Sequence, residues 1–492
     1  PQPFNARSRV HEYGGGVYCA CDHGIFFVND ADQDIYRIRD SSNPQRISVI
    51  EYALFADLCN DSRHNRILCV CEDHSNSATE PVNSLVSIDV TTGALSTLHQ
   101  GYDFYSNPRI NHDGSKLAWL SWNHPNMPWD GTELWLADVN ENGLLATHSH
   151  VAGSESTSIF QPEWSPDNIL YYVTDESGWW NLARHDKTGS LAVTTQKSEF
   201  GLPQWVFGQT TYAFSANNSV FCTHITNGVG RLSVIDLDTL EITAVETPQN
   251  SFVSICAADS TVCFIAASEN TFTQVIRLNT DNFESEVIAS SCNTNIEDGY
   301  LSRGQSFSFE TRHADKAYAI YYPPVNREHE APEGDLPPLI VLCHGGPTGM
   351  ADASLDLRKQ YWTSRGFAIV DVNYSGSTGY GRNYRNRLNG EWGVRDVEDV
   401  CDAANYFADK GIVDKNRLII KGSSAGGYTV LAALTFHNTF SCGASYYGIS
   451  NLESLITDTH KFESRYTDRL IGSYPEHRQL YYCLLYTSDA AD

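Results

Sequence analysis

The chain has 492 residues and a formal net charge of −27 at pH 7, with 41% hydrophobic and 19% charged residues. Its length exceeds that of one compact domain, so we expect at least two domains. The negative charge argues against nucleic-acid binding, because phosphate backbones would be repelled, and no apolar run approaches the roughly 18 residues that a membrane-spanning helix needs.

Residues 1–295 contain a repeat of short strands separated by Asn, Asp and Gly turns. Successive repeats are 43 to 50 residues apart, a period typical of β-propeller blades. The alternative, a series of unrelated β-hairpins, does not explain the near-constant interval. Because the chain begins at Pro1, inside the pattern, we expect a seven-bladed propeller that is incomplete. The repeats are marked by polar strand ends at Asp40, Asp89, Asp138, Asp186, Asp236 and Asn279.

The pattern changes near residue 296, where a hairpin and a Pro/Glu-rich linker precede apolar strands that alternate with helical stretches. Apolar spacing predicts a helix around 394–409. Continuous apolar strands alternating with helices predict a mostly parallel sheet covered on both faces, so we expect an α/β domain over 296–482. Its strands are LIVLCHGG (339–346), FAIVDVNY (367–374), RLIIKG (417–422) and CGASYYG (442–448).

The strongest chemical motif is Gly-Ser-Ser-Ala-Gly at 422–426. It lies between a predicted strand and a predicted helix, which is the context of the nucleophile elbow of an α/β-hydrolase. The turn is so tight that small residues must flank the serine, and Gly422 and Gly426 leave the Ser424 hydroxyl exposed above the sheet. The alternative is an ordinary strand-to-helix turn in which the serine caps the helix. We predict that Ser424 is a catalytic nucleophile.

A second motif, His-Gly-Gly-Pro at 344–347, directly follows the strand LIVLC. An α/β-hydrolase forms half of its oxyanion hole at a glycine-rich turn of this kind and the other half from the N–H after the nucleophile. These amides would be those of Gly346 and Ala425. The alternative is a tight strand-to-loop turn. His344 lies in this loop, and the motif leaves the role of its side chain open.

The acid and the histidine of a triad follow the nucleophile in this fold. Only 68 residues follow Ser424, and the candidates among them come too early. We therefore expect the triad Asp and His to lie outside this chain, the hydrolase domain to be truncated and the chain as given to be inactive. The segment 483–492 fits none of these patterns, and we expect it to be foreign to the fold and poorly packed. The candidates are Asp458, Asp468, His437, His460 and His477.

Seven motifs together resemble the prolyl oligopeptidase family of serine peptidases, in its acylaminoacyl-peptidase and dipeptidyl-aminopeptidase-like branch. The resemblance runs from residue 1 to about 482. It implies a propeller that caps an α/β-hydrolase and admits only short peptides, with Ser424 as the nucleophile and the Gly346 and Ala425 amides as the oxyanion hole. The motifs are VHEYGGG (10–16), SGWWNL (177–182), HGGP (344–347), NYSGSTGYG (373–381), EWG (391–393), GSSAGG (422–427) and THKFESRY (459–466).

These observations predict a serine peptidase that hydrolyses short peptides and needs neither a metal nor an organic cofactor. One alternative is a carboxylesterase, which would carry a helical cap rather than blades. The other is a non-catalytic propeller scaffold, which should have lost Ser424. The sequence does not choose among acylaminoacyl, dipeptidyl and prolyl specificity. An aminopeptidase needs carboxylates that pair with the substrate amine, and Glu155, Glu163 and Glu176 in predicted loops are candidates.

The thirteen cysteines are scattered and show no disulfide-like framework. Most lie in apolar runs, as core thiols do in a reducing compartment, so we expect a cytoplasmic protein. The expected partners are short peptide substrates, without nucleic acid or membrane, and homo-oligomerisation is left open.

Overall fold

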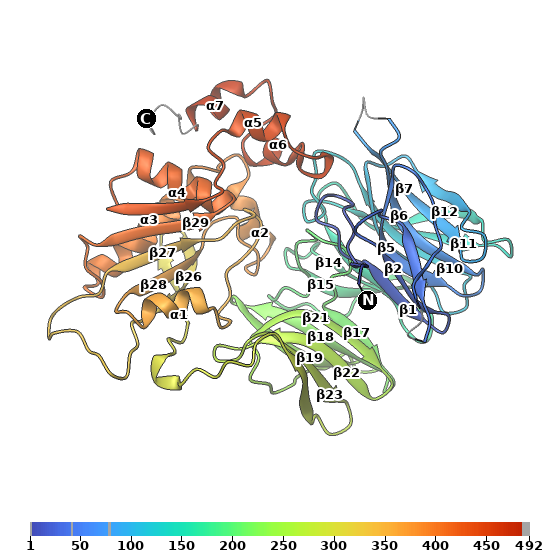
Figure 1. The fold of residues 1–492 in the computed structure, drawn as a ribbon, viewed down its shortest axis with the longest axis horizontal. Coiled ribbons are helices and arrows are strands. Elements are labelled where there is room, and N and C mark those ends of the chain that lie inside the picture. The colour runs from blue at the N-terminus through green and yellow to red at the C-terminus, as the bar shows by residue number, and fades with distance from the viewer. Residues whose placement is uncertain (1, 41–42, 77–79, 485–492) are drawn as a thin grey trace. The chain divides into compact units, whose positions relative to one another are not determined.

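The computed structural model describes residues 2–40, 43–76 and 80–484 (Figure 1). The chain divides into two compact units that are interleaved in sequence. Among the described residues, no helix combines the length and the apolar character needed to cross a bilayer. Unit 1 consists of Pro1–Gln196, Gly201–Thr210 and Thr459–Tyr466, and unit 2 consists of Lys197–Phe200, Thr211–Asp458 and Thr467–Asp492.

Unit 1 contains four antiparallel sheets, each built from four strands that are consecutive in the chain. The first has β1 (Tyr18–Cys21), β2 (Gly24–Val28), β3 (Ile35–Ile38) and β4 (Gln45–Arg46). The second has β5 (Ala53–Asp61), β6 (Arg66–Asp73), β7 (Val82–Asp89) and β8 (Leu95–Gln100). The third has β9 (Phe104–Ile110), β10 (Lys116–Trp122), β11 (Glu133–Val139) and β12 (Leu145–Gly153). The fourth has β13 (Ile159–Trp164), β14 (Leu170–Thr174), β15 (Asn181–Asp186) and β16 (Gly189–Ala192).

Unit 2 contains two further sheets of the same kind. One has β17 (Tyr212–Ser215), β18 (Ser219–Thr226), β19 (Val229–Asp236) and β20 (Ile242–Ala244). The other has β21 (Ser251–Ala258), β22 (Thr261–Ala267), β23 (Gln274–Asn279) and β24 (Ser285–Ser290). The described residues therefore form the six blades of a β-propeller. The predicted boundary near residue 295 falls after β24, inside unit 2, and stays a prediction.

The prediction of seven blades, the first of them incomplete, is wrong. The polar marks in the sequence fall at or just after the third strand of each sheet. The residues before the first mark, Asp40, already supply β1 and β2, which are the first two strands of the first sheet. Six marks therefore correspond to six four-stranded blades in the described residues.

A repeated bulge links neighbouring blades of unit 1. Asp57, Asn107 and Gln161 lie at corresponding places in β5, β9 and β13, and each has a left-handed φ between 46° and 55°. The Asp57 carboxylate accepts the Asn107 N–H at 2.6 Å and pairs with Arg109 at 3.1 Å. The same guanidinium lies 3.4 Å from Glu163 on β13. One partly buried cation between two carboxylates thus joins three sheets.

The motif THKFESRY contributes a segment of unit 1, although the chain on both sides of Thr459–Tyr466 belongs to unit 2. The Lys461 ammonium donates to the Asp103 carbonyl oxygen at 2.9 Å. The Phe462 ring is buried and stacks on the His11 ring, with 4.8 Å between the centroids. A half-buried charge and an aromatic stack therefore attach this segment to the blades.

The motif VHEYGGG, which contains His11, forms a loop with an unusual backbone. His11 and Glu12 have φ values of 57° and 65°, a conformation that is costly for residues other than glycine. The three following glycines are also left-handed, and a Cβ built on Gly15 would lie 2.3 Å from the Phe207 carbonyl oxygen. Only glycine allows this approach, which explains the run of three glycines.

The α/β part of unit 2 is a six-stranded sheet in the order β25-β26-β28-β27-β29-β30. The hairpin of β25 (Gln305–Glu310) and β26 (Lys316–Tyr322) is antiparallel to its neighbour β28. The remaining strands are mutually parallel and confirm the four predicted apolar strands. They are β28 (Ala368–Asn373), β27 (Leu339–Cys343), β29 (Leu418–Ser423) and β30 (Cys442–Tyr446).

The helices of this part follow the strands along the chain, and the helix predicted around 394–409 is α3. The α-helices are α1 (Leu357–Thr363), α2 (Arg382–Arg385), α3 (Arg395–Asp409), α4 (Ala425–Phe436), α5 (Leu452–Thr457), α6 (Tyr466–Leu470) and α7 (Arg478–Cys483). The short 3-10 turns are η1 (Asp298–Tyr300) and η2 (Asn386–Leu388), while η3 (Lys461–Glu463) lies in the unit 1 segment Thr459–Tyr466.

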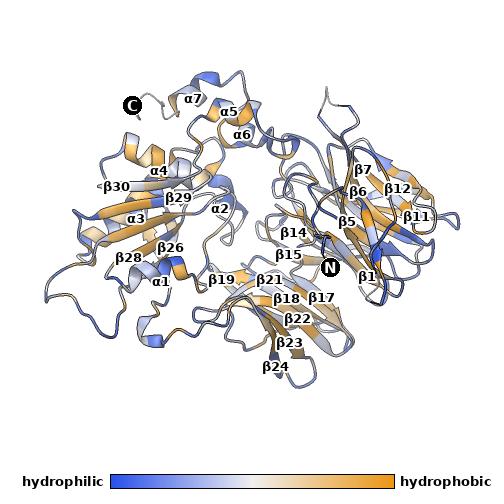
Figure 2. Ribbon diagram, in the orientation of Figure 1, coloured by the Kyte–Doolittle hydropathy of each residue, from blue (hydrophilic) through white to orange (hydrophobic). Residues whose placement is uncertain are grey.

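The central strands of the sheet are hydrophobic along most of their length (Figure 2). All residues of β28 are buried, and α3 buries Val397, Val400 and Phe407. Burial on both faces explains why these strands are continuous apolar runs. Among the described residues, β30 pairs only with β29, and Cys442, Gly443 and Tyr446 on it are exposed. This side of the sheet is therefore an open edge.

The segment 483–492 is described only at its start. Cys483 is exposed, whereas Leu484 is partly buried and its carbonyl oxygen accepts the Tyr428 hydroxyl at 3.2 Å. Leu485 and Tyr486, on which the expectation of poor packing also rests, lie outside the described residues.

Candidate active site

Ser424 lies at the sharp turn between β29 and α4. Its backbone has φ 56° and ψ −125°, which is a strained conformation for a residue with a side chain. The Ser424 N–H donates to the Tyr446 carbonyl oxygen on β30 at 3.1 Å, and its own carbonyl accepts the Tyr428 N–H at 3.1 Å. The turn is thus fixed from the neighbouring strand and from the helix. This is the geometry expected of a nucleophile elbow.

The two glycines of the elbow are required by close backbone contacts. A Cβ built on Gly422 would lie 2.3 Å from the Gly426 carbonyl oxygen. A Cβ built on Gly426 would lie 2.3 Å from the Cys343 carbonyl oxygen and 2.6 Å from that of His344. The helix α4 therefore begins in contact with the end of β27. These short distances to backbone carbonyl oxygens explain why small residues must flank the serine.

The glycine-rich turn after β27 lies beside the elbow. A Cβ built on Gly345 would be 3.5 Å from the Ser424 Cβ. Gly346 has φ 127°, a conformation that favours glycine. Ala425 is the first residue of α4, so its N–H has no acceptor within the helix. The structure brings together the four predicted residues Ser424, Ala425, His344 and Gly346 in one place, at the carboxyl ends of β27 and β29.

The His344 ring is held by the loop that follows β28. Its Nδ1 lies 2.8 Å from the Gly345 carbonyl oxygen, and its Nε2 lies 2.8 Å from the Ser377 hydroxyl. Because a carbonyl oxygen can only accept, Nδ1 carries the proton, while the Ser377 hydroxyl donates to the Tyr374 carbonyl oxygen at 2.7 Å and contacts Nε2. The ring also stacks on Tyr374 at 4.3 Å, and burial lowers the pKa of His344. The side chain therefore shapes the glycine turn and is occupied on both nitrogens.

The histidines that follow Ser424 do not complete a triad within the described ranges. Within residues 2–40, 43–76 and 80–484, no side chain is hydrogen-bonded to the Ser424 hydroxyl. His437 caps the far end of α4, and 12 helical residues separate the two ends by roughly 18 Å. His460 lies in unit 1 beside Glu463 at 3.2 Å, and the exposed His477 has Nδ1 3.1 Å from the Ser473 carbonyl oxygen.

The two acidic triad candidates follow β30 in the chain. Asp458 is exposed after α5 and its carboxylate accepts the Thr457 hydroxyl at 3.2 Å, while Asp468 lies in α6 and is partly buried. Among the amine-binding candidates, Glu155 and Glu176 are exposed in turns. Glu163 differs from the expectation, because it lies on β13 rather than in a loop and is paired with Arg109.

Two buried carboxylates on α3 support the elbow, and the sequence reasoning missed them. Asp396 accepts the Thr429 hydroxyl of α4 at 2.6 Å and the Gly393 N–H at 2.6 Å. Asp399 accepts the Ser375 N–H, in the loop after β28, at 2.7 Å. Both side chains are completely buried, and burial raises the pKa of each to about 6. The signal for them was two acids, three residues apart, on the same face of the helix as the apolar Val400 and Phe407.

We expect Asp396→Asn to remove a pH-dependent loss of stability. The pKa of Asp396 in the folded chain is about 6, above its ordinary value of 3.8, so the folded state binds this proton more tightly. The stabilisation is fully present below pH 4 and is lost as the pH rises through 6. In urea unfolding, the free energy of unfolding of the wild type minus that of the variant should fall over this window and then level off.

The exposed Asp409 at the end of the same helix provides the matched control. Asp409→Asn removes an exposed carboxylate from the same helix, and the fall between pH 4 and 6 should be larger for Asp396→Asn than for this control. A flat difference for Asp396→Asn would contradict the assignment of a buried, proton-binding carboxyl.

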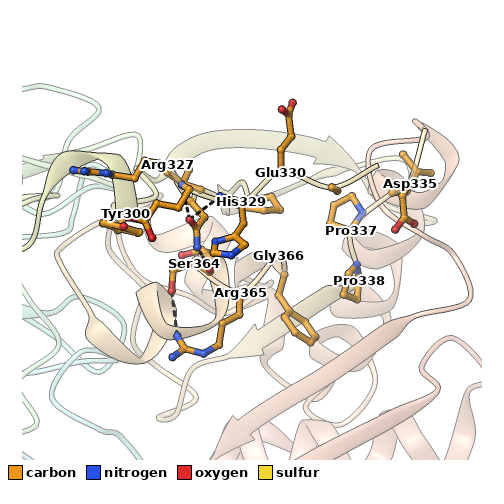
Figure 3. A pocket seen from close by; sticks show the side chains of 18 of the residues that line it. Tyr300, Arg327, His329, Glu330, Asp335, Pro337, Pro338, Ser364, Arg365 and Gly366 are labelled. Carbon is orange, nitrogen blue, oxygen red and sulfur yellow. Dashed lines mark hydrogen bonds between the residues drawn. The ribbon is translucent and has the colours of Figure 1, made fainter. Parts of the chain in front are cut away.

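A large open pocket of unit 2 lies away from Ser424 (Figure 3). It is lined by parts of the linker 324–338, by residues 363–367 at the end of α1, and by Arg417. The linker and Arg417 directly precede β27 and β29, so the pocket lies at the amino ends of these parallel strands. Ser424 follows the carboxyl end of β29. The pocket is therefore at the opposite edge of the sheet and is not part of the candidate site.

Among the described residues, no group of three or more His, Cys, Asp or Glu side chains is arranged to hold a metal ion. All described cysteines are free thiols, and most are at least partly buried. Burial raises the pKa of Cys343, which lies at the end of β27, well above its ordinary value.

Comparisons with known proteins agree with the fold and the motifs. The model of the prolyl oligopeptidase family matches residues 353–488. A Mycobacterium tuberculosis puromycin-hydrolyzing peptidase of known structure is 36% identical, with a TM-score of 0.93, over 99% of this chain and 77% of that one. A crystal structure of puromycin hydrolase is 32% identical, with a TM-score of 0.93, over 98% of this chain and 77% of that one. The chain belongs to the prolyl oligopeptidase family.

Curated relatives match over shorter stretches. Dipeptidyl aminopeptidase BIII of Pseudoxanthomonas mexicana is 34% identical over 140 residues, which are 28% of this chain and 20% of that protein. Dipeptidyl peptidase family member 6 of Caenorhabditis elegans is 37% identical over 146 residues, which are 27% of this chain and 20% of that protein. The matches therefore span about a fifth of the length of these relatives. The family match ends at residue 488, so it includes the start of the segment 483–492 that was expected to be foreign.

Proposed function

We propose that Ser424 is the nucleophile of a serine peptidase that hydrolyses short peptides. The observation that carries this proposal is the left-handed Ser424 at the strand-to-helix turn, with the glycine turn after β27 beside it, in a chain of the prolyl oligopeptidase family. We propose that the propeller comprises residues 1–295 and that the catalytic domain comprises residues 296–482. The alternative of a non-catalytic scaffold is disfavoured because the elbow keeps its serine.

The proposed reaction follows the serine-peptidase scheme. The Ser424 oxygen attacks the scissile carbonyl carbon while its proton passes to a histidine, which an aspartate orients. The Gly346 and Ala425 N–H groups hold the resulting oxyanion. The histidine then gives the proton to the leaving amine, and water releases the acyl group from Ser424. We propose that this histidine and aspartate lie outside the described residues, since no histidine within them is hydrogen-bonded to Ser424.

The proposed substrates are short peptides cleaved near one end, as in the acylaminoacyl and dipeptidyl enzymes to which the chain is similar. For a free substrate amine, Glu155 and Glu176 remain proposals as exposed carboxylates, while Glu163 already pairs with Arg109. The proposal includes a cytoplasmic location and no cofactor, and it leaves homo-oligomerisation open. A carboxylesterase is the second candidate, because the elbow alone does not distinguish esters from amides.

A substrate panel tests the proposal on a form of the protein extended through the whole hydrolase domain. We expect dipeptidyl or acylaminoacyl arylamides to be cleaved and denatured casein to be left intact, because a propeller that caps the site admits only short chains. Release of arylamine, and peptide release from casein, are the two measurements. Hydrolysis of simple esters without any arylamide cleavage would favour the carboxylesterase, and casein cleavage at a comparable rate would contradict an oligopeptidase.

A further inference from the structure

We propose that Glu199, a residue of the propeller sequence, is a positioning residue for the oxyanion turn and acts through the loop 374–381. The proposal rests on the proposed function, because it assumes that the turn containing Gly346 serves Ser424. Glu199 belongs to unit 2, as do all residues invoked here, and it is 1% exposed. Its backbone pairs in both directions with Ile225 of β18, at 2.9 Å each way. Its Oε1 accepts the Gly381 N–H at 2.9 Å.

The loop 374–381 packs closely against the blade that carries Ile225. A Cβ built on Gly379 would lie 3.4 Å from the Ile225 Cγ2 and 3.0 Å from the Met350 Sδ. A Cβ built on Gly228, in the turn between β18 and β19, would lie 2.3 Å from the Tyr380 hydroxyl. Close packing of this kind transmits a displacement rather than absorbing it. The position of the loop is therefore set by blade residues.

The same loop holds the oxyanion turn at several points. The Ser377 hydroxyl binds the His344 Nε2 at 2.8 Å, and the Tyr374 hydroxyl donates to the His344 carbonyl oxygen at 2.9 Å. The Thr378 N–H donates to the Gly349 carbonyl oxygen at 2.9 Å. Gly346 lies between these two attachment points. A loop fixed at Gly381 by Glu199 therefore fixes the turn on both sides of the proposed oxyanion donor.

A long side chain that ends in an acceptor oxygen suits this task, because the buried Gly381 N–H needs a hydrogen-bond partner. Removing it leaves the Gly381 N–H in a site that excludes water, and the loop must shift to recover a partner. Glutamine keeps one amide oxygen at the position of Oε1. We therefore expect Glu199→Gln to behave nearly as the wild type and Glu199→Ala to loosen the loop and the oxyanion turn together.

Hydrogen exchange followed by mass spectrometry on the chain as given tests this inference without any need for catalysis. In Glu199→Ala, we expect amides in 373–381 and in 344–350 to exchange at least about 10-fold faster, with Glu199→Gln close to the wild type. Ser233→Ala, which removes a contact with His224 elsewhere in the same blade, should change neither segment. Unchanged exchange in 344–350, or acceleration spread over the whole blade, would overturn the proposal.

A double substitution separates positioning from a general loss of stability. Ser377→Ala alone should accelerate exchange in 344–350, because it removes the link to His344. Combined with Glu199→Ala, it should add little more in that segment, since both act along one route. Independent, additive accelerations would contradict the route through the loop.

The activity measurement uses the form extended through the whole hydrolase domain. Glu199→Ala should lower kcat by about 10- to 100-fold and leave KM within about twofold, because a misplaced oxyanion donor acts on the transition state. A rise of about 10- to 100-fold in KM with kcat unchanged would contradict a positioning role. If the extended wild type shows no peptidase activity, the proposed function fails, while the exchange experiment still decides whether Glu199 positions the turn.

Discussion

Replacing Ser424 with alanine is expected to abolish covalent labelling by a fluorophosphonate probe in the form extended through the whole hydrolase domain. Peptide hydrolysis by that form should fall by about 10⁶-fold, the scale of loss when the serine of a catalytic triad is removed. The physical reason is that substrate binding and the oxyanion hole alone leave only about 10³–10⁴-fold over the reaction in water. Probe fluorescence at the size of the protein and arylamine release are the measurements.

The neighbouring serine supplies the matched control for this experiment. Ser423 ends β29, one residue before the elbow, and differs from Ser424 in its ordinary strand conformation. Ser423→Ala should label as strongly as the wild type. Labelling that survives Ser424→Ala would show a different nucleophile, and absence of labelling in every extended form would favour the non-catalytic scaffold.

The chain as given should label weakly in the same assay. Without a base, the Ser424 hydroxyl is an ordinary alcohol, and no described side chain is hydrogen-bonded to it. Strong labelling of residues 1–492 alone would show that a base lies within them. His437 and His460 would then be the first residues to replace.

The sequence predicted the propeller but not its number of blades, for a specific reason. Each polar mark reports one strand end per blade, and in the structure this is the end of the third strand. The strands before Asp40 are short and carry no mark of their own, so β1 and β2 could not be assigned to the first blade. The α/β strands were easier to predict, because burial on both faces makes each a continuous apolar run.

The core of the candidate site was predictable because parallel strands place their carboxyl ends at one edge. The motifs after β27 and β29 had to lie near each other once both strands were assigned to one sheet, which β27 and β29 confirm by direct pairing. The supporting residues were not predictable in this way. Asp396, Ser377 and Glu199 act through contacts with residues 33, 33 and 182 positions away, which no local pattern reveals.

The substitution Gly426→Ala is expected to destabilise the α/β part severely and to abolish labelling of Ser424 in the fraction that folds. Its Cβ would lie 2.3 Å from the Cys343 carbonyl oxygen and 2.6 Å from that of His344, and backbone atoms cannot rotate out of the way. The start of α4 must therefore move away from the oxyanion turn, which separates the Ala425 and Gly346 amides.

Overpacking of a core typically costs about 1–3 kcal/mol, and we expect at least the upper end here because both partners are backbone. Thr435→Ala, on the exposed side of the same helix, is the control and should change the free energy of unfolding by less than about 0.5 kcal/mol. Urea unfolding measures the stability, and probe labelling of the extended form measures the site. Wild-type stability together with wild-type labelling in Gly426→Ala would show that α4 does not begin against the end of β27, and the proposed oxyanion hole would then lack its geometry.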